Sequence, residues 1–171
     1  HATGMYELFE QGGEKWEGKR FDTPIKIWVV GESAKSVKTI LQQELIGNFN
    51  DQGSGQIPKH LITKVVNKPG NPECIDTVYV KHFTDGIYDG ETQIDFMAYE
   101  QGPTKFQGTS IHVIWMDEEA DNIMIKVECA TRTMKTSTFA GGILLFTWTP
   151  WKGATDMVLS FLPDAVVPPD H

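Results

Sequence analysis

The sequence predicts an α/β protein in which helices flank a mostly parallel β-sheet. Residues 110–116 form a continuous apolar run of the kind found in strands that are covered on both faces. Residues 25–31 form a second apolar run, and segments with helical spacing of apolar residues separate the predicted strands. This alternation of strands and helices is typical of helices packed on a parallel sheet.

The first predicted unit is a strand over 25–31 followed by a turn and a helix over 33–46. Ser33 supplies an N-cap for this helix, and Gly47 ends it. Apolar residues recur between them at the helical period, at Val37, Ile40, Leu41 and Leu45. Residues 48–58 are typical of a loop.

The rest of the chain contains a predicted hairpin, a helix and a further buried strand. Strands over 75–83 and 92–99 are separated by the turn-rich residues 84–90, so we expect them to pair as a hairpin. Residues 122–134 are expected to be helical, and residues 143–147 to form a buried strand. We expect three strands to be neighbours in the sheet: 25–31, 111–116 and 143–147.

The composition is that of one globular domain. The chain has 171 residues, of which 40% are hydrophobic and 22% are charged, which is enough to bury a core. We expect a single domain over 1–162 and a linker-like tail over 163–171 that contains three prolines. Because the chain begins with His1 rather than Met, we expect it to be a fragment of a longer protein.

The net charge excludes proteins that bind nucleic acid through an overall basic field. It is −8, from 23 acidic and 15 basic residues, so any DNA contact requires a local patch. Cys74 and Cys129 match no metal-ligand spacing and are expected to be core thiols of a reducing compartment. Neither an apolar run of 18 residues nor a signal peptide is present, so we expect a soluble, intracellular protein.

The most informative motif is the acidic pair Asp117-Glu118 at the carboxyl end of the apolar run 110–116. ATP-hydrolysing motors place such a pair, the Walker B element, at a strand end. One carboxylate holds waters around Mg²⁺ and the next orients the water that attacks the γ-phosphate. Asp117 and Glu118 fit these roles. The same pattern also occurs as a strand stop or as acidic charge at a helix N-terminus.

Two glycine-containing segments are poor candidates for a phosphate-binding loop. Residues 13–20 match Gly-x-x-x-x-Gly-Lys, but Arg20 stands where the loop needs Ser or Thr, and a strand rather than a helix follows. This segment is predicted to be a surface turn. Residues 53–55, Gly-Ser-Gly, are predicted to be a flexible loop.

A second polar motif follows the strand 143–147. Thr147 and Thr149 lie at the carboxyl end of that strand, so their hydroxyls would come close to the γ-phosphate if the strand lies beside the one that ends in Asp117. A simple turn is the alternative, because Pro150 and Gly153 follow. The spacing of about 30 residues from Asp117, with one helix between, favours the functional interpretation.

Several segments together resemble the ATPase domain of the large terminase subunit of tailed bacteriophages. The resemblance covers roughly residues 16–161, and order and spacing agree along it. It rests on these segments: 16–22 (WEGKRFD), 24–25 (PI), 57–59 (IPK), 99–102 (YEQG), 105–111 (KFQGTSI), 113–119 (VIWMDEE), 131–133 (TRT), 141–142 (GG) and 147–153 (TWTPWKG).

This resemblance implies a RecA-like P-loop NTPase fold of the additional-strand (ASCE) class, incomplete at the N-terminus, and a role in packaging double-stranded DNA. It implies that Asp117 supports Mg²⁺, that Glu118 is the catalytic residue, and that Thr147 and Thr149 couple ATP hydrolysis to DNA movement. The implied partners are double-stranded DNA, the small terminase subunit, the portal of the procapsid and further copies in a ring. The implied location is the host cytoplasm.

The chain departs from the family pattern in several places. We identify neither a phosphate-binding loop, nor an adenine-contacting segment, nor a nuclease domain, so the isolated chain is expected to hydrolyse ATP poorly or not at all. Gln107-Gly108 stands where many members have Arg-Gly, which leaves Lys105 or Arg132 as candidate cations. Arg132 is equally a candidate for a structural ion pair. A helicase-like P-loop NTPase and a degenerate, non-enzymatic scaffold remain alternatives.

Overall fold

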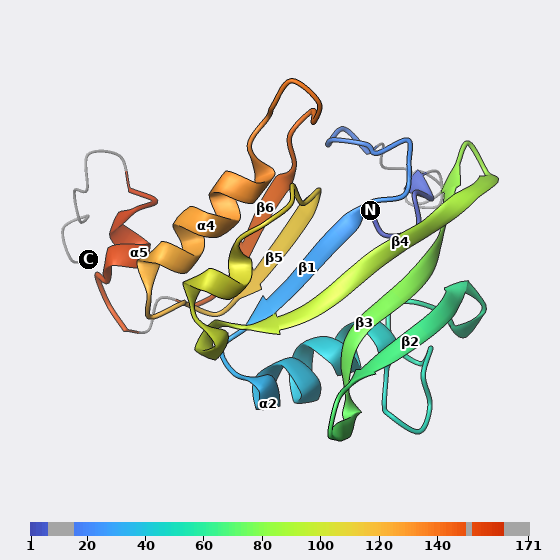
Figure 1. The fold of residues 1–171 in the computed structure, drawn as a ribbon, viewed down its shortest axis with the longest axis horizontal. Coiled ribbons are helices and arrows are strands. Elements are labelled where there is room, and N and C mark those ends of the chain that lie inside the picture. Colours follow the sequence, from blue (N-terminus) through green and yellow to red (C-terminus); the bar gives the residue numbers. More distant parts are fainter. Residues whose placement is uncertain (7–15, 150–151, 163–171) are drawn as a thin grey trace.

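The computed structural model describes residues 1–6, 16–149 and 152–162, and its centre is one six-stranded sheet (Figure 1). The spatial order of the strands is β2-β3-β4-β1-β5-β6. In chain order they are β1 (Lys26–Gly31), β2 (Ile62–Lys68), β3 (Asn71–Thr84), β4 (Ile87–Ala98), β5 (Val113–Asp117) and β6 (Ile143–Thr147).

The three strands predicted to be neighbours do lie side by side, as β1, β5 and β6. β1 pairs in parallel with β4 on one side and with β5 on the other, and β5 pairs in parallel with β6. The prediction of a mostly parallel sheet is confirmed in part: three of the five strand pairings are parallel, whereas β3 is antiparallel to both β2 and β4. The sheet is therefore mixed, with an antiparallel edge on a parallel core.

The predicted hairpin is confirmed as β3 and β4, and it is longer than expected. Its turn consists of Asp85 and Gly86, both with positive φ (50° and 75°), which suits a two-residue hairpin loop. The edge strand β2, which pairs with β3, was not predicted from the sequence. Its side chains are only partly buried and include Lys64 and Lys68, so it lacks a clear alternation of apolar and polar residues.

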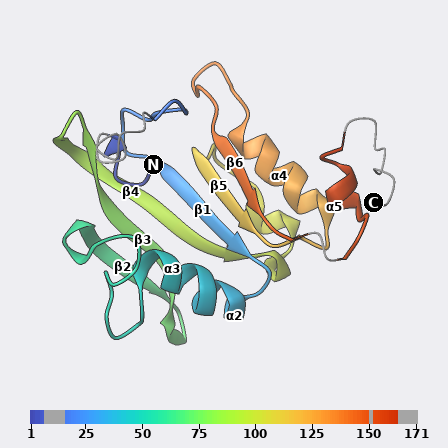
Figure 2. The same ribbon diagram turned by 180° about the vertical axis from the view of Figure 1, so that it is seen from behind.

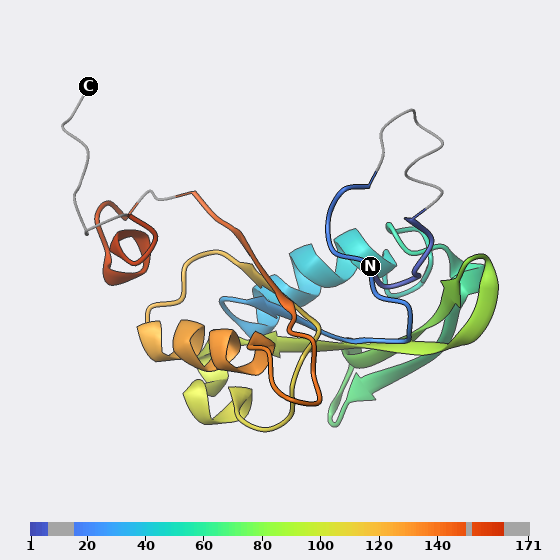
Figure 3. The same ribbon diagram turned by 90° about the horizontal axis from the view of Figure 1, so that it is seen from above.

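Helical segments cover the sheet on both faces (Figure 3). Ser33 caps the predicted first helix, since its Oγ accepts a hydrogen bond from the Ser36 amide, and Gly47 ends that helix with φ of 94°. The helix contains an unpredicted π-helical stretch. The segments are α2 (Ala34–Ser36), π-helical η1 (Val37–Gln42), α3 (Gln43–Ile46), α4 (Ile123–Thr133), α5 (Asp156–Leu159), and the 3-10 turns η2 (Lys59–Leu61), η3 (Tyr99–Gln101) and η4 (Pro103–Phe106).

The core has two layers, one on each side of the sheet. Ile27 and Val29 of β1 pack in the layer beneath α2, η1 and α3, whereas Trp28 and Val30 pack in the layer beneath α4. This alternation follows from the period-2 geometry of a strand. A strand buried on both faces reads as a continuous apolar run, which is why β1 and β5 were recognisable in the sequence. Figure 2 shows β6 at the edge of the sheet.

The cysteines, the helices and two predicted segments can be compared with the sequence predictions. Cys74 and Cys129 are both buried, as expected for core thiols. In the described part of the chain, no helix is long and apolar enough to cross a bilayer. The predicted tail over 163–171 and the first part of the predicted surface turn, residues 13–15, lie outside the described residues.

The packing leads to a prediction about stability. Ile114 in β5 is fully buried, whereas Leu145 in the neighbouring strand β6 is 49% exposed. We expect Ile114→Ala to lower the free energy of unfolding by about 2–5 kcal/mol, because it leaves a cavity in the core. Leu145→Ala is the matched control and should cost less than about 1 kcal/mol. Urea denaturation followed by circular dichroism measures both, and equal losses would contradict the burial assignment.

Candidate functional site

The candidate site lies at the carboxyl ends of the parallel strands, which together form one edge of the sheet. Asp117 is the last residue of β5 and Thr147 the last residue of β6, and the two are paired in register. Glu32 follows the end of β1, and Tyr99 follows the end of β4. Parallel pairing brings four segments that are distant in the sequence to one edge. In α/β sheets, this edge is where ligands bind.

Thr147 holds the carboxylate of Asp117 through its side chain. The Thr147 hydroxyl donates a hydrogen bond of 2.7 Å to Asp117 Oδ1. The same hydroxyl accepts a bond of 2.6 Å from the indole Nε1 of Trp115. The indole therefore orients the hydroxyl towards the carboxylate. Asp117 and Thr147 belong to two separate sequence motifs, and the fold brings them into contact.

Glu118 occupies an unusual backbone conformation. Its φ is 61°, in the left-handed region, and its amide donates a hydrogen bond of 2.8 Å to the carbonyl of Thr147. The side chain is exposed and lines a cavity of about 250 Å³ together with Glu32, Glu119 and Lys152. Glu118 thus lies beside the Asp117 and Thr147 pair with its side chain exposed, and its catalytic role stays a prediction.

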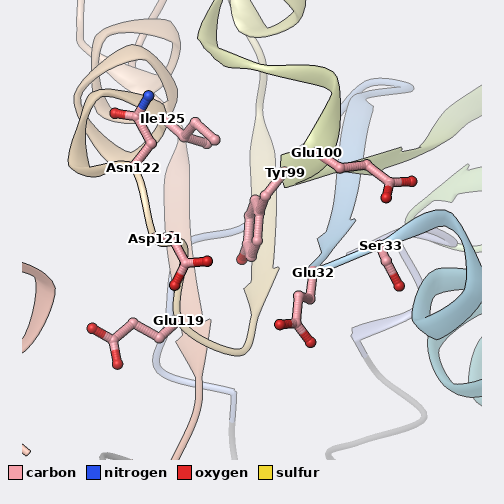
Figure 4. A pocket seen from close by; sticks show the side chains of 8 residues that line it. All are labelled: Glu32, Ser33, Tyr99, Glu100, Glu119, Asp121, Asn122 and Ile125. Atoms are coloured by element: carbon pink, nitrogen blue, oxygen red, sulfur yellow. The ribbon is translucent and has the colours of Figure 1, made fainter. Parts of the chain in front are cut away.

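A larger cavity of about 540 Å³ adjoins these residues (Figure 4). Its lining consists of Glu32, Ser33, Tyr99, Glu100, Glu119, Asp121, Asn122 and Ile125. Four of these side chains are carboxylates. Figure 4 shows the carboxyl groups of Glu32 and Asp121 on either side of the Tyr99 ring. Such a cavity attracts cations, and it repels a phosphate group unless a cation accompanies it.

Residues 118–121, the acidic segment after β5, are joined to residues 152–155, which follow β6, by two side-chain contacts. The buried carboxylate of Glu119 accepts a hydrogen bond from the Thr155 hydroxyl, and Thr155 is the N-cap of α5. Asp121 forms an ion pair of 2.8 Å with Lys152, and this hydrogen bond raises the pKa of Lys152. A movement of the acidic segment would therefore be transmitted to α5.

Thr149 and the two candidate cations, Lys105 and Arg132, make no hydrogen bond to Asp117 or Glu118 among the described residues. Thr149 is exposed beyond the end of β6, and no hydrogen bond among the described residues joins it to Asp117 or Glu118. Arg132 contacts the carbonyl of Gly108 and pairs with Glu128 at 3.9 Å. Arg132 belongs to the end of α4 and makes the ion pair expected of a structural residue, and its role as a candidate cation stays a prediction.

Lys105 lines a separate cavity of about 190 Å³, together with Asp76 and Asp95. Four further residues shape the site and were not predicted from the sequence as site residues: Glu32, Tyr99, Glu119 and Thr155. Tyr99 carried no signal of its own, since its partners become clear only when the order of the strands is known. No cluster of three or more His, Cys, Asp or Glu side chains that could hold a metal occurs within the described ranges.

Comparison with known proteins points to one family. Residues 8–167 match the family described as terminase large subunit, T4likevirus-type, N-terminal. The chain is 40% identical over 173 residues to the large terminase subunit of Salmonella phage P22, a match that covers 95% of this chain and 34% of the P22 protein. The chain thus spans about a third of the length of that relative. No solved structure matches the chain.

Tyr99 allows a prediction about pH. Burial raises the pKa of its hydroxyl above the usual value near 10, and Cys129, Asp117 and Glu118 add to the rise. The neutral hydroxyl therefore contributes stability that is complete below pH 10 and declines as the pH rises further. Above pH 10, the free energy of unfolding should fall more steeply for the wild type than for Tyr99→Phe, by up to about 1.4 kcal/mol per pH unit.

Urea denaturation at pH values between 8 and 11 provides the measurement, with the exposed Tyr88 replaced by Phe as the control. The Tyr88→Phe variant should keep the wild-type slope. Parallel alkaline slopes for the wild type and Tyr99→Phe would contradict the role of burial.

Proposed function

The chain belongs to the large terminase subunits, and from this premise we propose that it forms part of an ATP-hydrolysing motor that moves double-stranded DNA into a procapsid. The observation that carries the proposal is the contact between Asp117 at the end of β5 and Thr147 at the end of β6. It places a fixed carboxylate at the ligand-binding edge of a parallel sheet. We also propose that the domain is RecA-like, which accords with β5 lying between two parallel neighbours.

ATP is the proposed substrate and Mg²⁺ its companion ion. Mg²⁺ would supply positive charge to the phosphate oxygens. Asp117 would hold the ion, and the donor set fits, because Mg²⁺ in nucleotide sites takes one or two protein carboxylates and completes its shell with water and phosphate. The remaining parts of the nucleotide site would come from other regions of a longer subunit, since this chain covers 34% of the P22 protein.

Glu118 is the proposed catalytic residue. Its carboxylate is exposed at the opening of the site, directly after the residue proposed to hold the ion. From there it would orient the attacking water and accept its proton. Thr147 would keep Asp117 in one orientation through its hydroxyl, so that the two carboxylates have separate tasks.

Thr147 and Thr149 are proposed to couple hydrolysis to DNA movement. Thr147 contacts Asp117 directly, and the chain beyond Thr149 is tied to the acidic segment through Lys152 and Thr155. A change at Asp117 would thus reach β6 through Thr147, and α5 through the contact of Glu119 with Thr155. Other members of the assembly are proposals on the same basis: the small terminase subunit, the portal of the procapsid, further copies in a ring, and the host cytoplasm as the location.

Two substitutions in the complete subunit test the division of labour between the carboxylates. Glu118→Gln should retain ATP binding but lower kcat by about 10²-fold or more, the scale of a general base. Asp117→Asn should weaken Mg²⁺-dependent ATP binding as well. Steady-state ATPase assays and nucleotide titrations at several Mg²⁺ concentrations measure both effects.

The matched control is Glu91→Gln, which neutralises an exposed carboxylate in β4, remote from the site. It should behave like the wild type. Turnover by Glu118→Gln at the rate of this control would remove Glu118 as the catalytic residue and contradict the proposed function.

Coupling is tested by Thr149→Val in the same subunit. Because Thr149 makes no hydrogen bond to Asp117 or Glu118 within the described chain, the substitution should leave at least about half of the ATPase rate while DNA packaging falls about 10-fold. Thr63→Val, in the edge strand β2, serves as the control. Equal losses of hydrolysis and packaging in Thr149→Val would contradict a coupling role.

A further inference from the structure

The backbone at Glu118 is strained in a way that its own sequence does not require. A φ of 61° is unfavourable for a non-glycine residue, because its Cβ crowds the backbone in the left-handed region. Among the described non-glycine residues, Asp85 is the other one with positive φ, and there a two-residue hairpin turn requires it. Glu118 lies in no hairpin, so other contacts must hold its conformation.

The hydroxyl of Tyr99 supplies two of these contacts. Its single proton is shared between the carbonyl oxygens of Asp117 and Glu118 in a bifurcated hydrogen bond, with each oxygen 3.1 Å away. Tyr99 follows β4, whereas the two carbonyls belong to the end of β5, and β1 lies between those strands. The phenol therefore reaches past the end of β1 to the turn after β5.

The Tyr99 ring is well placed to hold a fixed position. It is 7% exposed and packs in the core layer that includes Phe106 and Ile125. On the opposite side, the Glu118 amide donates to the Thr147 carbonyl of β6 at 2.8 Å. The turn is thus held from both sides, by a side chain that follows β4 and by the backbone of β6.

We propose that Tyr99 is a positioning residue that holds the Asp117-Glu118 turn in its left-handed conformation and thereby directs the Glu118 carboxylate to the reacting water. This inference rests on the proposed function, because it requires Glu118 to be catalytic. The Tyr99 hydroxyl contacts backbone carbonyls, so it acts through Glu118. Its loss should let the turn relax and displace the carboxylate.

A purely structural role for Tyr99 makes a different prediction from a positioning role. A structural tyrosine would cost stability when its hydroxyl is removed, with no effect on the chemical step. A positioning tyrosine would lower kcat and leave the KM for ATP nearly unchanged, because the Asp117 carboxylate, which is proposed to hold Mg²⁺, keeps its hydrogen bond from Thr147. The change in kcat compared with the change in KM therefore separates a positioning role from a structural one.

The test compares Tyr99→Phe with Tyr6→Phe in the complete subunit. Tyr6 is also buried, and its hydroxyl accepts a hydrogen bond of 3.1 Å from the Phe21 amide, away from the site. Tyr6→Phe therefore removes a comparable buried hydroxyl. We expect Tyr99→Phe to lower kcat about 10-fold, with KM within about 2-fold of the wild type. Tyr6→Phe should keep the wild-type kcat, and similar kcat values in both variants would overturn the proposal.

Hydrogen exchange of the peptide that contains Glu118 gives a readout independent of turnover. In Tyr99→Phe the Glu118 amide should exchange faster than in the wild type and in Tyr6→Phe, because the turn is held from one side only. Wild-type exchange in Tyr99→Phe would overturn the proposal even if that variant is less stable.

A double variant distinguishes failure of this inference from failure of the proposed function. Single-turnover rates of Glu118→Gln and of Glu118→Gln with Tyr99→Phe should be equal, because a residue that acts through Glu118 has no effect once that carboxylate is gone. A further loss in the double variant would overturn the positioning role. If Glu118→Gln is inactive and Tyr99→Phe behaves like Tyr6→Phe, this inference fails while the proposed function stands.

Discussion

The parallel pairing of β4, β1, β5 and β6 is the constraint on which the rest of the structure depends. Parallel strands end at the same edge, so Glu32, Tyr99, Asp117 and Thr147 come together although they span more than a hundred residues of sequence. An antiparallel β5 would place Asp117 at the opposite edge. The register matters equally, because the pairing of Asp117 with Thr147 is what allows the hydroxyl to reach the carboxylate.

Electrostatics explains the organisation of the segment that follows β5. Its acidic side chains would repel one another without partners, and the structure gives each a different environment. Asp117 accepts from Thr147, Asp121 pairs with Lys152, and the buried Glu119 accepts from Thr155. A buried carboxylate is costly unless it is hydrogen-bonded. These contacts therefore both stabilise the segment and connect the edge of the sheet to α5.

How far the sequence predicted the fold depended on the contrast between buried and exposed residues. β1 and β5 are covered on both faces and were recognisable as apolar runs, as was the helix that Ser33 caps. β2 was missed because its side chains are mostly half-buried or exposed at the sheet edge. The antiparallel pairing of β3 and β4 was predicted as a hairpin, but the parallel pairing of β4 with β1 joins segments distant in the chain, which no local pattern indicates.

The sequence by itself determined the chemical groups of the candidate site and their positions at strand ends, because an apolar run followed by Asp117 and Glu118 is a local pattern. Only the tertiary structure decided which groups meet. The contact between Asp117 and Thr147 depends on strand register, and that between Tyr99 and the Glu118 carbonyl depends on the order β4-β1-β5. The strand register and the strand order both arise from packing between segments distant in the chain, which no local pattern encodes.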